Sequence, residues 1–368
     1  MAIYVWGYLK EYAEERREVL EAVEGVLESG KLILGPNVEA FEAEFAAYCG
    51  ARHGIGVDNG TNAIFLALKA VGVEPGDEVI TVTNTAVPTV SAIVSAGAVP
   101  RFVDIDPATY LMDTRRLEDA VTPKTRCIVP VHLYGQCVDM DAVRAVAARH
   151  DLKVVEDCAQ AHGARFKGNV AGSMSDASAF SFYPTKILGT YGDGGMVLTS
   201  DDEVRGRMRR LRFYGMESTY YANEHGYNSR LDELHAAILR NKLKRLDGYI
   251  ARRRELAERY DGMLAGTGLV LPACGAGNFH AYYLYVVRHP ARDEIIAKLK
   301  ENDIHVNISY PWPIHTMDGY ARFGGREGDL PHAEAAAREI FSLPMFPSLD
   351  NDDQDEVCRV LGGILESL

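Results

Sequence analysis

Residues 180–195, FSFYPTKILGTYGDGG, form the stretch that decides the fold. The alternating apolar residues at 177–182 predict a strand, and the glycines at 192–195 lead into a second strand that ends near residue 199. Lys186 lies between the two strands, just after Pro184, whose fixed φ disfavours a strand interior. A loop that withdraws a lysine from water favours the neutral amine, which attacks carbonyls and forms Schiff bases. A lone lysine is more often a surface residue, so this interpretation depends on the rest of the chain.

The composition excludes several classes of partner. The chain has 368 residues and a formal net charge of −13, which argues against nucleic acid and against anionic membranes. The six cysteines lack the spacing of metal ligands, so we expect free thiols in a reducing cytoplasm and no metal site. The N-terminus does not resemble a secretion signal and no apolar run reaches membrane-spanning length, so we expect a cytoplasmic protein.

Short apolar runs alternate with helical patterns from residue 53 onward. We expect strands at 54–57, 78–83, 99–103, 126–131 and 153–156, with helices near 63–71, 89–96, 114–120 and 140–150. This alternation predicts an α/β fold whose mostly parallel sheet is covered by helices on both faces. Ligands bind beyond the carboxyl ends of the strands in such a sheet.

Three segments of different character follow one another along the chain. Residues 1–50 contain two helical patterns and are expected to form an N-terminal helical arm. Residues 51–245 form the large α/β domain, and residues 246–368 form a smaller α+β domain. Long helices over 231–264 connect the two domains, and the smaller one is expected to contain strands at 281–287 and 304–309 and helices near 293–301, 333–340 and 352–365.

Two further motifs could carry chemistry. The sequence DNGTNA at 58–63 joins a strand to a helix, where free backbone N–H groups and the hydroxyl of Thr61 make an anion site. A helix cap without a ligand explains this pattern nearly as well. The sequence VVEDCAQAHG at 154–163 places Asp157 at the end of an apolar strand, where a carboxylate could hold a proton on a ring nitrogen. Gln160 and His162 follow closely enough to reach the same ligand, and the alternative for Asp157 is a cap of the next turn.

Together these motifs match the needs of one cofactor. A loop lysine, a strand-end aspartate and an anion site at a helix start are the three anchors that pyridoxal 5'-phosphate requires. The lysine would bind its aldehyde, the aspartate its pyridinium nitrogen and the anion site its phosphate. Along the chain the anion site comes first, the aspartate second and the lysine third.

The chain resembles the DegT-type nucleotide-sugar aminotransferases, which are pyridoxal-phosphate enzymes of fold-type I, over nearly its whole length. Besides the motifs around Asp157 and Lys186, the resemblance rests on SGKLILGP at 29–36, DIDP at 104–107 and YPWPIH at 310–315. It implies a large domain with a mostly parallel, seven-stranded mixed sheet between helices, and a smaller α+β domain. One departure is Ala86, which stands where many members carry an aromatic ring that stacks on the cofactor. We therefore assign no stacking residue.

The resemblance also implies roles for individual residues. Lys186 would form the Schiff base and shuttle the proton between cofactor and substrate carbons, Asp157 would pair with the pyridinium, and Gln160 would touch the ring oxygen. The phosphate would be bound by Gly60, Thr61 and Ser181, with Asn228 from the neighbouring subunit. A site completed in this way implies a homodimer with shared active sites. The expected substrate contacts are His315, Tyr310, Tyr183, Tyr214, Arg230 and His162.

For Tyr310, Tyr183 and Tyr214, a place in an aromatic core is an equal alternative. His315 is a stronger candidate for a substrate contact, because a proline-rich loop is an unusual place for a buried structural histidine.

The implied reaction moves an amino group from glutamate or glutamine to a nucleotide-linked ketosugar. The stretch GYNSRLDELH at 226–235 is more similar to the 3-keto enzymes of the family, so a dTDP-linked 3-keto-6-deoxyhexose is expected, with a 4-keto sugar as the alternative. A regulatory protein that binds the cofactor without turnover is a second alternative. A dehydratase of the family is disfavoured, because those similar to this chain replace the lysine or add an iron–sulfur site. A dehydrogenase is disfavoured because no Gly-x-Gly-x-x-Gly turn follows the first strand.

Overall fold

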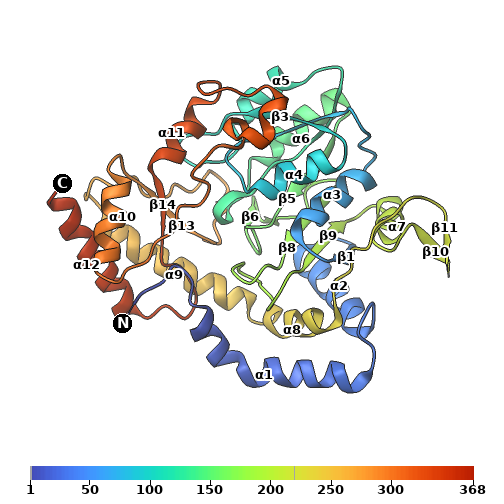
Figure 1. Ribbon diagram of the computed structural model, residues 1–368, viewed down its shortest axis with the longest axis horizontal. Helices are drawn as coiled ribbons and strands as arrows, with labels where there is room; N and C mark the ends of the chain where they lie inside the picture. The colour runs from blue at the N-terminus through green and yellow to red at the C-terminus, as the bar shows by residue number, and fades with distance from the viewer. Residues whose placement is uncertain (1, 219) are drawn as a thin grey trace.

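The computed structural model of the protein describes residues 2–218 and 220–368. A seven-stranded sheet with the order β1-β9-β8-β5-β4-β2-β3 forms the centre of the α/β part of the chain (Figure 1). All neighbouring strands are parallel except at β9, which runs antiparallel to β1 and β8. The expected mostly parallel mixed sheet is confirmed. Its strands are β1 (His53–Val57), β2 (Glu78–Val82), β3 (Val99–Val103), β4 (Thr125–Ile128), β5 (Lys153–Asp157), β8 (Ala177–Ser181) and β9 (Gly195–Thr199).

Helices cover both faces of this sheet, which is why every residue of β8 and β9 is buried. One face packs on α3 (Gly60–Ala70), α4 (Val87–Ser95) and α7 (Asp202–Leu211). The other packs on α2 (Pro36–Cys49), α6 (Met140–His150) and α8 (Glu233–Leu243). Because side chains alternate along a strand, Val155 joins the first core and Val154 the second. Asp157 therefore lies on the face of α3 and α4.

The N-terminal segment contacts several parts of the molecule. Ile3 forms a bridge with Ile304 in the C-terminal part of the chain, and Figure 1 shows the N-terminus beside that part. Helix α1 (Tyr8–Ser29) then extends along α8, and α2 packs against β1. The proposed boundaries at residues 50 and 245 stay predictions, although the second falls in the short connection between α8 and α9 (Leu246–Leu264).

The C-terminal part contains a two-stranded antiparallel sheet formed by β13 (Tyr285–Arg288) and β14 (Ile340–Leu343). The strand predicted at 304–309 is wrong, because that segment makes only isolated bridges at Ile304 and Asn307. The strand predicted from residue 281 starts later, because Tyr282 has a left-handed φ of 48° that interrupts the extended run. The helices are α10 (Arg292–Glu301), α11 (Pro331–Glu339) and α12 (Asn351–Glu366).

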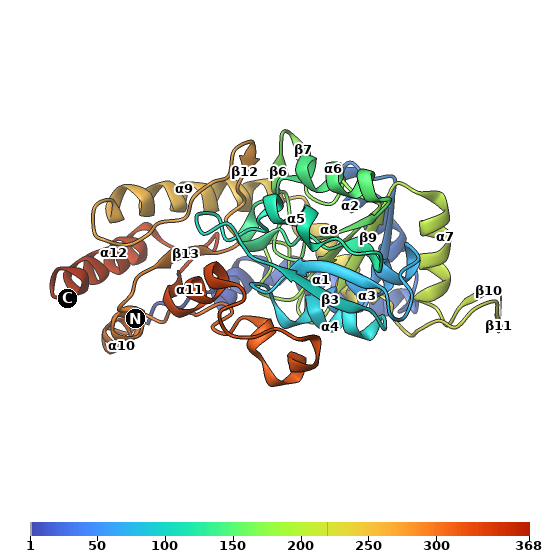
Figure 2. The same ribbon diagram turned by 90° about the horizontal axis from the view of Figure 1, so that it is seen from above.

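Several short elements complete the fold. A hairpin of β10 (Met216–Ser218) and β11 (Tyr221–Ala222) extends away from the body of the molecule (Figure 2). A small sheet consists of β6 (Arg165–Phe166), β7 (Asn169–Val170) and β12 (Asn278–Phe279), and α5 (Leu117–Ala120) is a single helical turn. Within residues 2–218 and 220–368, no helix is both long enough and apolar enough to cross a membrane.

Candidate active site

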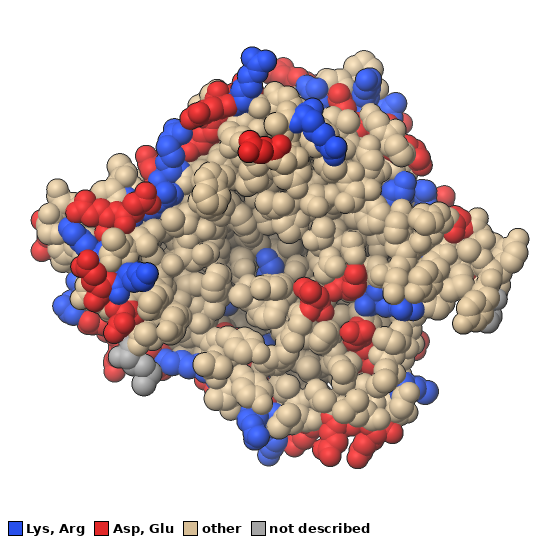
Figure 3. Space-filling model, in the orientation of Figure 1, with Lys and Arg blue, Asp and Glu red and all other residues tan. Residues whose placement is uncertain are grey.

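Lys186 is held in the loop that joins β8 to β9, as the sequence predicts. The base of the loop is closed by hydrogen bonds from Phe182 N to Gly194 O at 2.8 Å and from Thr190 N to Phe182 O at 2.8 Å. The lysine is half-buried, and its Nζ lies 4.7 Å from the centre of the Tyr283 ring. The face shown in Figure 3 is hollowed near its middle, and Lys or Arg atoms are visible inside the hollow.

Asp157 is buried at the carboxyl end of β5, with only 4 % of its surface exposed. Its Oδ2 accepts a hydrogen bond from Thr89 Oγ1 at 2.7 Å, and its Oδ1 accepts one from Ala159 N at 3.1 Å. Burial raises the pKa of Asp157, while these donors and the nearby Lys186 charge act in the opposite direction. Each carboxylate oxygen retains a lone pair, so Asp157 can accept a proton-bearing ring nitrogen.

The start of α3 is built as an anion site. Asn59 caps the helix by accepting hydrogen bonds from Asn62 N through its side chain and from Ala63 N through its carbonyl. The amides of Gly60 and Thr61 have no acceptor among the described residues, so they stay available to a ligand. A Cβ added at Gly60 would lie 2.6 Å from Ser181 Cβ, so only glycine lets the helix start approach the end of β8. This cradle fits the phosphate of the expected cofactor.

The Gly60→Ala variant is expected to bind pyridoxal phosphate on the order of 10-fold or more weakly, because relieving that overlap displaces either the helix start or Ser181. The measurement is a titration of the apo-protein with the cofactor. Gly248→Ala in α9 is the matched control, since an added Cβ there meets no described atom within 4 Å. Equal cofactor affinity in the two variants would contradict the assignment of the cradle.

The sequence matches the model of the DegT/DnrJ/EryC1/StrS aminotransferase family over residues 13–362. The chain belongs to this family. It is 59 % identical over its whole length to dTDP-3-amino-3,4,6-trideoxy-alpha-D-glucose transaminase from Micromonospora megalomicea subsp. nigra, and it also covers 100 % of that protein.

Solved structures of family members agree with the fold. The crystal structure of DesV from S. venezuelae in complex with a ketimine intermediate superposes with a TM-score of 0.98 at 42 % identity, covering 100 % of this chain and 99 % of that one. The structure of ntda from Bacillus subtilis, with bound cofactor PMP, has a TM-score of 0.90 at 31 % identity and covers 96 % of this chain and 82 % of that one. These comparisons confirm the predicted family and fold, and with them an aminotransferase that uses pyridoxal phosphate.

Gln160 and Tyr310 are brought together, but they bind each other. Gln160 Nε2 donates to the Tyr310 hydroxyl, and Gln160 Oε1 accepts from Tyr134 N at 2.8 Å. The rings of Tyr310 and Tyr134 stack with centroids 6.4 Å apart. Burial raises the pKa of Tyr310 well above its ordinary value, so the hydroxyl stays protonated. Gln160 Nε2 carries a second N–H, which is left for a contact with the cofactor ring, and that contact stays a proposal.

His162 does not lie on an open face of the site, contrary to its expected role in substrate binding. It is fully buried, with its ring 5.4 Å from that of Phe180 and 5.8 Å from that of Phe182. Neither ring nitrogen has a hydrogen-bond partner among the described residues. Burial, with the positive charge of Lys186, lowers its pKa to about 3. The structure therefore places His162 in the aromatic core as a neutral residue.

This placement predicts a pH effect on stability. Because the folded pKa of His162 lies below that of the unfolded chain, the folded state loses stability as the pH falls below about 6.5. His162→Phe removes that contribution. The free energy of unfolding of this variant, relative to that of the wild type, should therefore increase by about 1.4 kcal/mol for each unit by which the pH falls in this acid range. Urea unfolding of the apo-proteins between pH 7 and pH 5 measures the difference. A pH-independent difference would show that His162 is not buried in its neutral form.

His315 is also buried, with 1 % of its surface exposed, and both ring nitrogens are bonded within the protein. Its Nδ1 lies 2.8 Å from Thr83 Oγ1 and its Nε2 lies 3.1 Å from Glu334 Oε1. The expectation of a substrate contact therefore needs correction. His315 ties the proline-rich loop to the end of β2, and the contacts that bury it come from residues far away in the sequence.

The remaining predicted substrate residues are accessible. Tyr183 and Tyr214 expose 52 % and 43 % of their surfaces, so neither is a core aromatic within this chain. The guanidinium of Arg230 lies over the rings of Phe213 and Tyr214, at 5.3 and 5.6 Å from their centroids. Asn228 is exposed. Roles for these residues toward a substrate or a neighbouring subunit stay proposals.

Two residues next to Asp157 and Lys186 were not predicted from the sequence. Thr89 donates to Asp157, and Tyr283 supplies the ring beneath Lys186 and reaches Thr185 Oγ1 with its hydroxyl at 3.2 Å. The segment around Thr89 differs from many family members by its missing aromatic ring and is similar to the 3-keto enzymes, and neither feature predicts a contact with Asp157. Tyr283 belongs to a stretch that was interpreted as a strand, so no signal in the sequence marked either residue.

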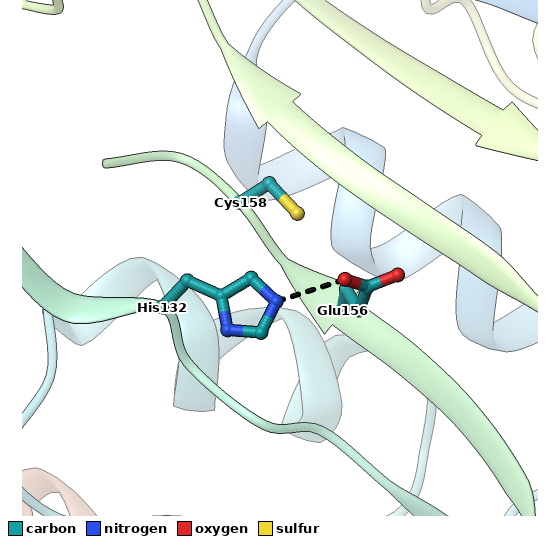
Figure 4. Close-up of side chains that lie close together, drawn as sticks. All are labelled: His132, Glu156 and Cys158. Atoms are coloured by element: carbon teal, nitrogen blue, oxygen red, sulfur yellow. Dashed lines mark hydrogen bonds and ion pairs between the residues drawn. The ribbon is translucent and has the colours of Figure 1, made fainter. Parts of the chain in front are cut away.

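One cluster in the described chain has the spacing of metal ligands, namely His132, Glu156 and Cys158 (Figure 4). Its imidazole is already used: His132 Nδ1 accepts from Val138 N, which leaves Nε2 to donate to Glu156 at 2.8 Å. Burial alone would raise the pKa of Glu156, but the hydrogen bonds that it accepts outweigh burial and lower it. The donors are His132, Gly172 N, Met174 N and Ser175 Oγ. We assign this cluster a structural role in holding β5.

Proposed function

We propose that the protein transfers an amino group from glutamate or glutamine to carbon 3 of a dTDP-linked keto-deoxysugar, with pyridoxal phosphate as cofactor. The observation that carries the proposal is the convergence of three anchors at the carboxyl ends of β1, β5 and β8. These anchors are the Gly60–Thr61 amides, the Asp157 carboxylate and the Lys186 amine. They fit the phosphate, the ring nitrogen and the aldehyde of one molecule.

The cofactor, when bound, supplies an aldehyde that exchanges amines and a ring that withdraws electrons from the adjacent carbon. The protein has to hold this group and move protons. Lys186 Nζ is placed to remove the proton from the α-carbon of the donor and to return a proton during transfer to the sugar. The buried Asp157 carboxylate would hold a proton on the ring nitrogen through a charge-assisted hydrogen bond, and the start of α3 would hold the phosphate.

The substrate class is supported by similarity. The relative from Micromonospora megalomicea is named as a transaminase of a dTDP-3-amino sugar, and the match extends over both complete chains. A 4-keto sugar and a regulatory role without turnover are the alternatives. A cytoplasmic location and the lack of a nucleic-acid or membrane partner stay predictions from the sequence.

The experiment is the reverse reaction, which uses the aminated nucleotide sugars as substrates. The holoenzyme is incubated with 2-oxoglutarate or 2-oxoglutaramate, the keto acids of the two candidate donors, and with either a dTDP-3-amino or a dTDP-4-amino deoxysugar. The amino acid product and the keto sugar are identified by mass spectrometry. We expect turnover of the 3-amino sugar. Exclusive turnover of the 4-amino sugar would favour the first alternative, and cofactor binding without turnover of either sugar would favour the regulatory protein.

We also propose a homodimer whose active sites are shared. Large apolar side chains are exposed on α1 and on the β10–β11 hairpin: Leu9, Leu27, Tyr220 and Tyr221 expose 77 %, 58 %, 94 % and 67 % of their surfaces. Such exposure supports burial against a second copy.

If Asn228 completes the site of the neighbouring subunit, mixing inactive Lys186→Ala and Asn228→Ala chains should restore activity, because each mixed dimer contains one intact site. No recovery in a verified mixed dimer would contradict shared sites.

A further inference from the structure

A chain of two threonine hydroxyls leads to the carboxylate of Asp157. Thr85 Oγ1 lies 2.8 Å from Thr89 Oγ1, and Thr89 Oγ1 lies 2.7 Å from Asp157 Oδ2. Thr85, Thr89 and Asp157 expose 2 %, 1 % and 4 % of their surfaces, so both hydroxyls and the carboxylate are shielded from bulk water. These two hydrogen bonds connect the loop after β2 to the end of β5.

The direction of both hydrogen bonds follows from proton counting. An ionised carboxylate only accepts hydrogen bonds, so the single hydroxyl proton of Thr89 has to point at Asp157. Thr89 then has no second proton to share, and Thr85 must be the donor in the contact between the two threonines. Donation by Thr85 polarises the Thr89 hydroxyl and strengthens its bond to the carboxylate.

The backbone fixes this arrangement. Thr89 lies in the first turn of α4, where its amide donates to Ala86 O at 3.1 Å. Pro88 occupies one of the first two positions of the helix, where its fixed φ favours helical backbone. The rigid start of α4 therefore positions the Thr89 side chain next to Asp157. On the other side, Ala159 N occupies Oδ1 at 3.1 Å, so the carboxylate is held by one donor on each oxygen.

We infer that Thr85 and Thr89 are positioning residues for the cofactor ring. Together they hold the Asp157 carboxylate ionised and orient its remaining lone pairs toward the site of the ring nitrogen. This inference rests on the proposed function, because it takes Asp157 as the partner of that nitrogen. It gives a function to the segment 84–89, where the chain lacks the aromatic ring that many family members have.

The test is a set of variants reconstituted with pyridoxal phosphate that carries ¹⁵N in its ring. The ¹⁵N chemical shift at a fixed neutral pH reports how far the ring nitrogen is protonated. Cofactor affinity and the rate of the half-reaction with glutamate are measured in parallel. The variants are Thr89→Val, Thr89→Ser, Thr85→Val and the Thr85→Val/Thr89→Val pair. Thr81→Val is the matched control, because Thr81 is equally buried but its hydroxyl donates to Val129 O at 3.0 Å.

Thr89→Val is expected to shift the ring ¹⁵N signal toward the unprotonated form and to slow the half-reaction by about 10- to 100-fold, the usual effect of losing a hydrogen bond to a charged group. Thr89→Ser should restore both readouts, and Thr85→Val should change them in the same direction but less. In the double variant the Thr85 change should add nothing, because its effect passes through Thr89.

Three results would overturn the inference: a wild-type ring signal in Thr89→Val, an equal effect in Thr81→Val, or fully additive effects in the double variant. The ring signal needs only bound cofactor and no sugar substrate. A failure of the proposed sugar reaction would therefore leave this test intact, and the two failures can be told apart.

Discussion

Replacing Lys186 with alanine is expected to reduce amine transfer by at least about 10³-fold, because one side chain supplies both the amine that bonds the cofactor and the base that moves the proton. The fold should survive, since the Lys186 side chain is only half-buried and its described contact is the Tyr283 ring. The cofactor should still bind through the helix start and Asp157, although with altered absorption. Steady-state turnover and the visible spectrum of the variant measure the two effects.

Lys167→Ala is the control for this change, because Lys167 is a surface lysine that pairs with Asp141 at 2.6 Å. It should keep full activity. A small primary amine added to the Lys186→Ala enzyme should restore part of the proton transfer, since it can occupy the space of the lost side chain. Retention of more than a few per cent of wild-type activity without added amine would contradict the role given to Lys186.

Asp157→Asn is expected to lower turnover by roughly 10²- to 10³-fold, because the buried carboxylate that stabilises the ring proton is replaced by a neutral amide of the same size. The amide leaves the ring nitrogen without a negative partner, so the ring withdraws electrons less effectively. Single-turnover kinetics with the amino donor measure this step directly.

Asp157→Asn should not lower the stability of the apo-protein, in contrast to its effect on turnover. Burial raises the pKa of Asp157 above its ordinary value, so the folded state binds this proton more tightly than the unfolded chain. The contribution of Asp157 to the stability of the folded state is therefore most favourable below the pKa that it has in the unfolded chain. This contribution is lost as the pH rises through the pKa that it has in the folded protein. At neutral pH the Asn variant should be as stable as the wild type or more stable, as measured by urea unfolding. A variant with near wild-type turnover would contradict the role of Asp157, and a strongly destabilised one would mean that the charge is structural.

The features that could be predicted from the sequence are those set by local pattern. The apolar runs that became β5 and β8 fix where Asp157 and Ser181 lie, because a strand end is also the end of the apolar run. The Asn59 cap and Gly60 mark the start of α3 in the same local way. These elements hold the three cofactor anchors, which explains why the cofactor could be inferred before the structure.

The features that could not be predicted depend on contacts between distant parts of the chain. His315 was expected to face a substrate, but its partners are Thr83 and Glu334, and the first of these lies 232 positions away in the sequence. Thr89 reaches Asp157 across 68 positions in the sequence. Strands of two residues, such as β6, are too short to produce a periodic pattern.

The central claim is that the amine of Lys186 is the covalent anchor of the cofactor while Asp157 keeps the ring protonated. Borohydride reduction of the holoenzyme followed by peptide mapping tests the covalent part directly. The account predicts a single pyridoxyl label on Lys186, in the peptide that contains FYPTKILG. A label on a different lysine, or no label in protein that carries the cofactor, would contradict it.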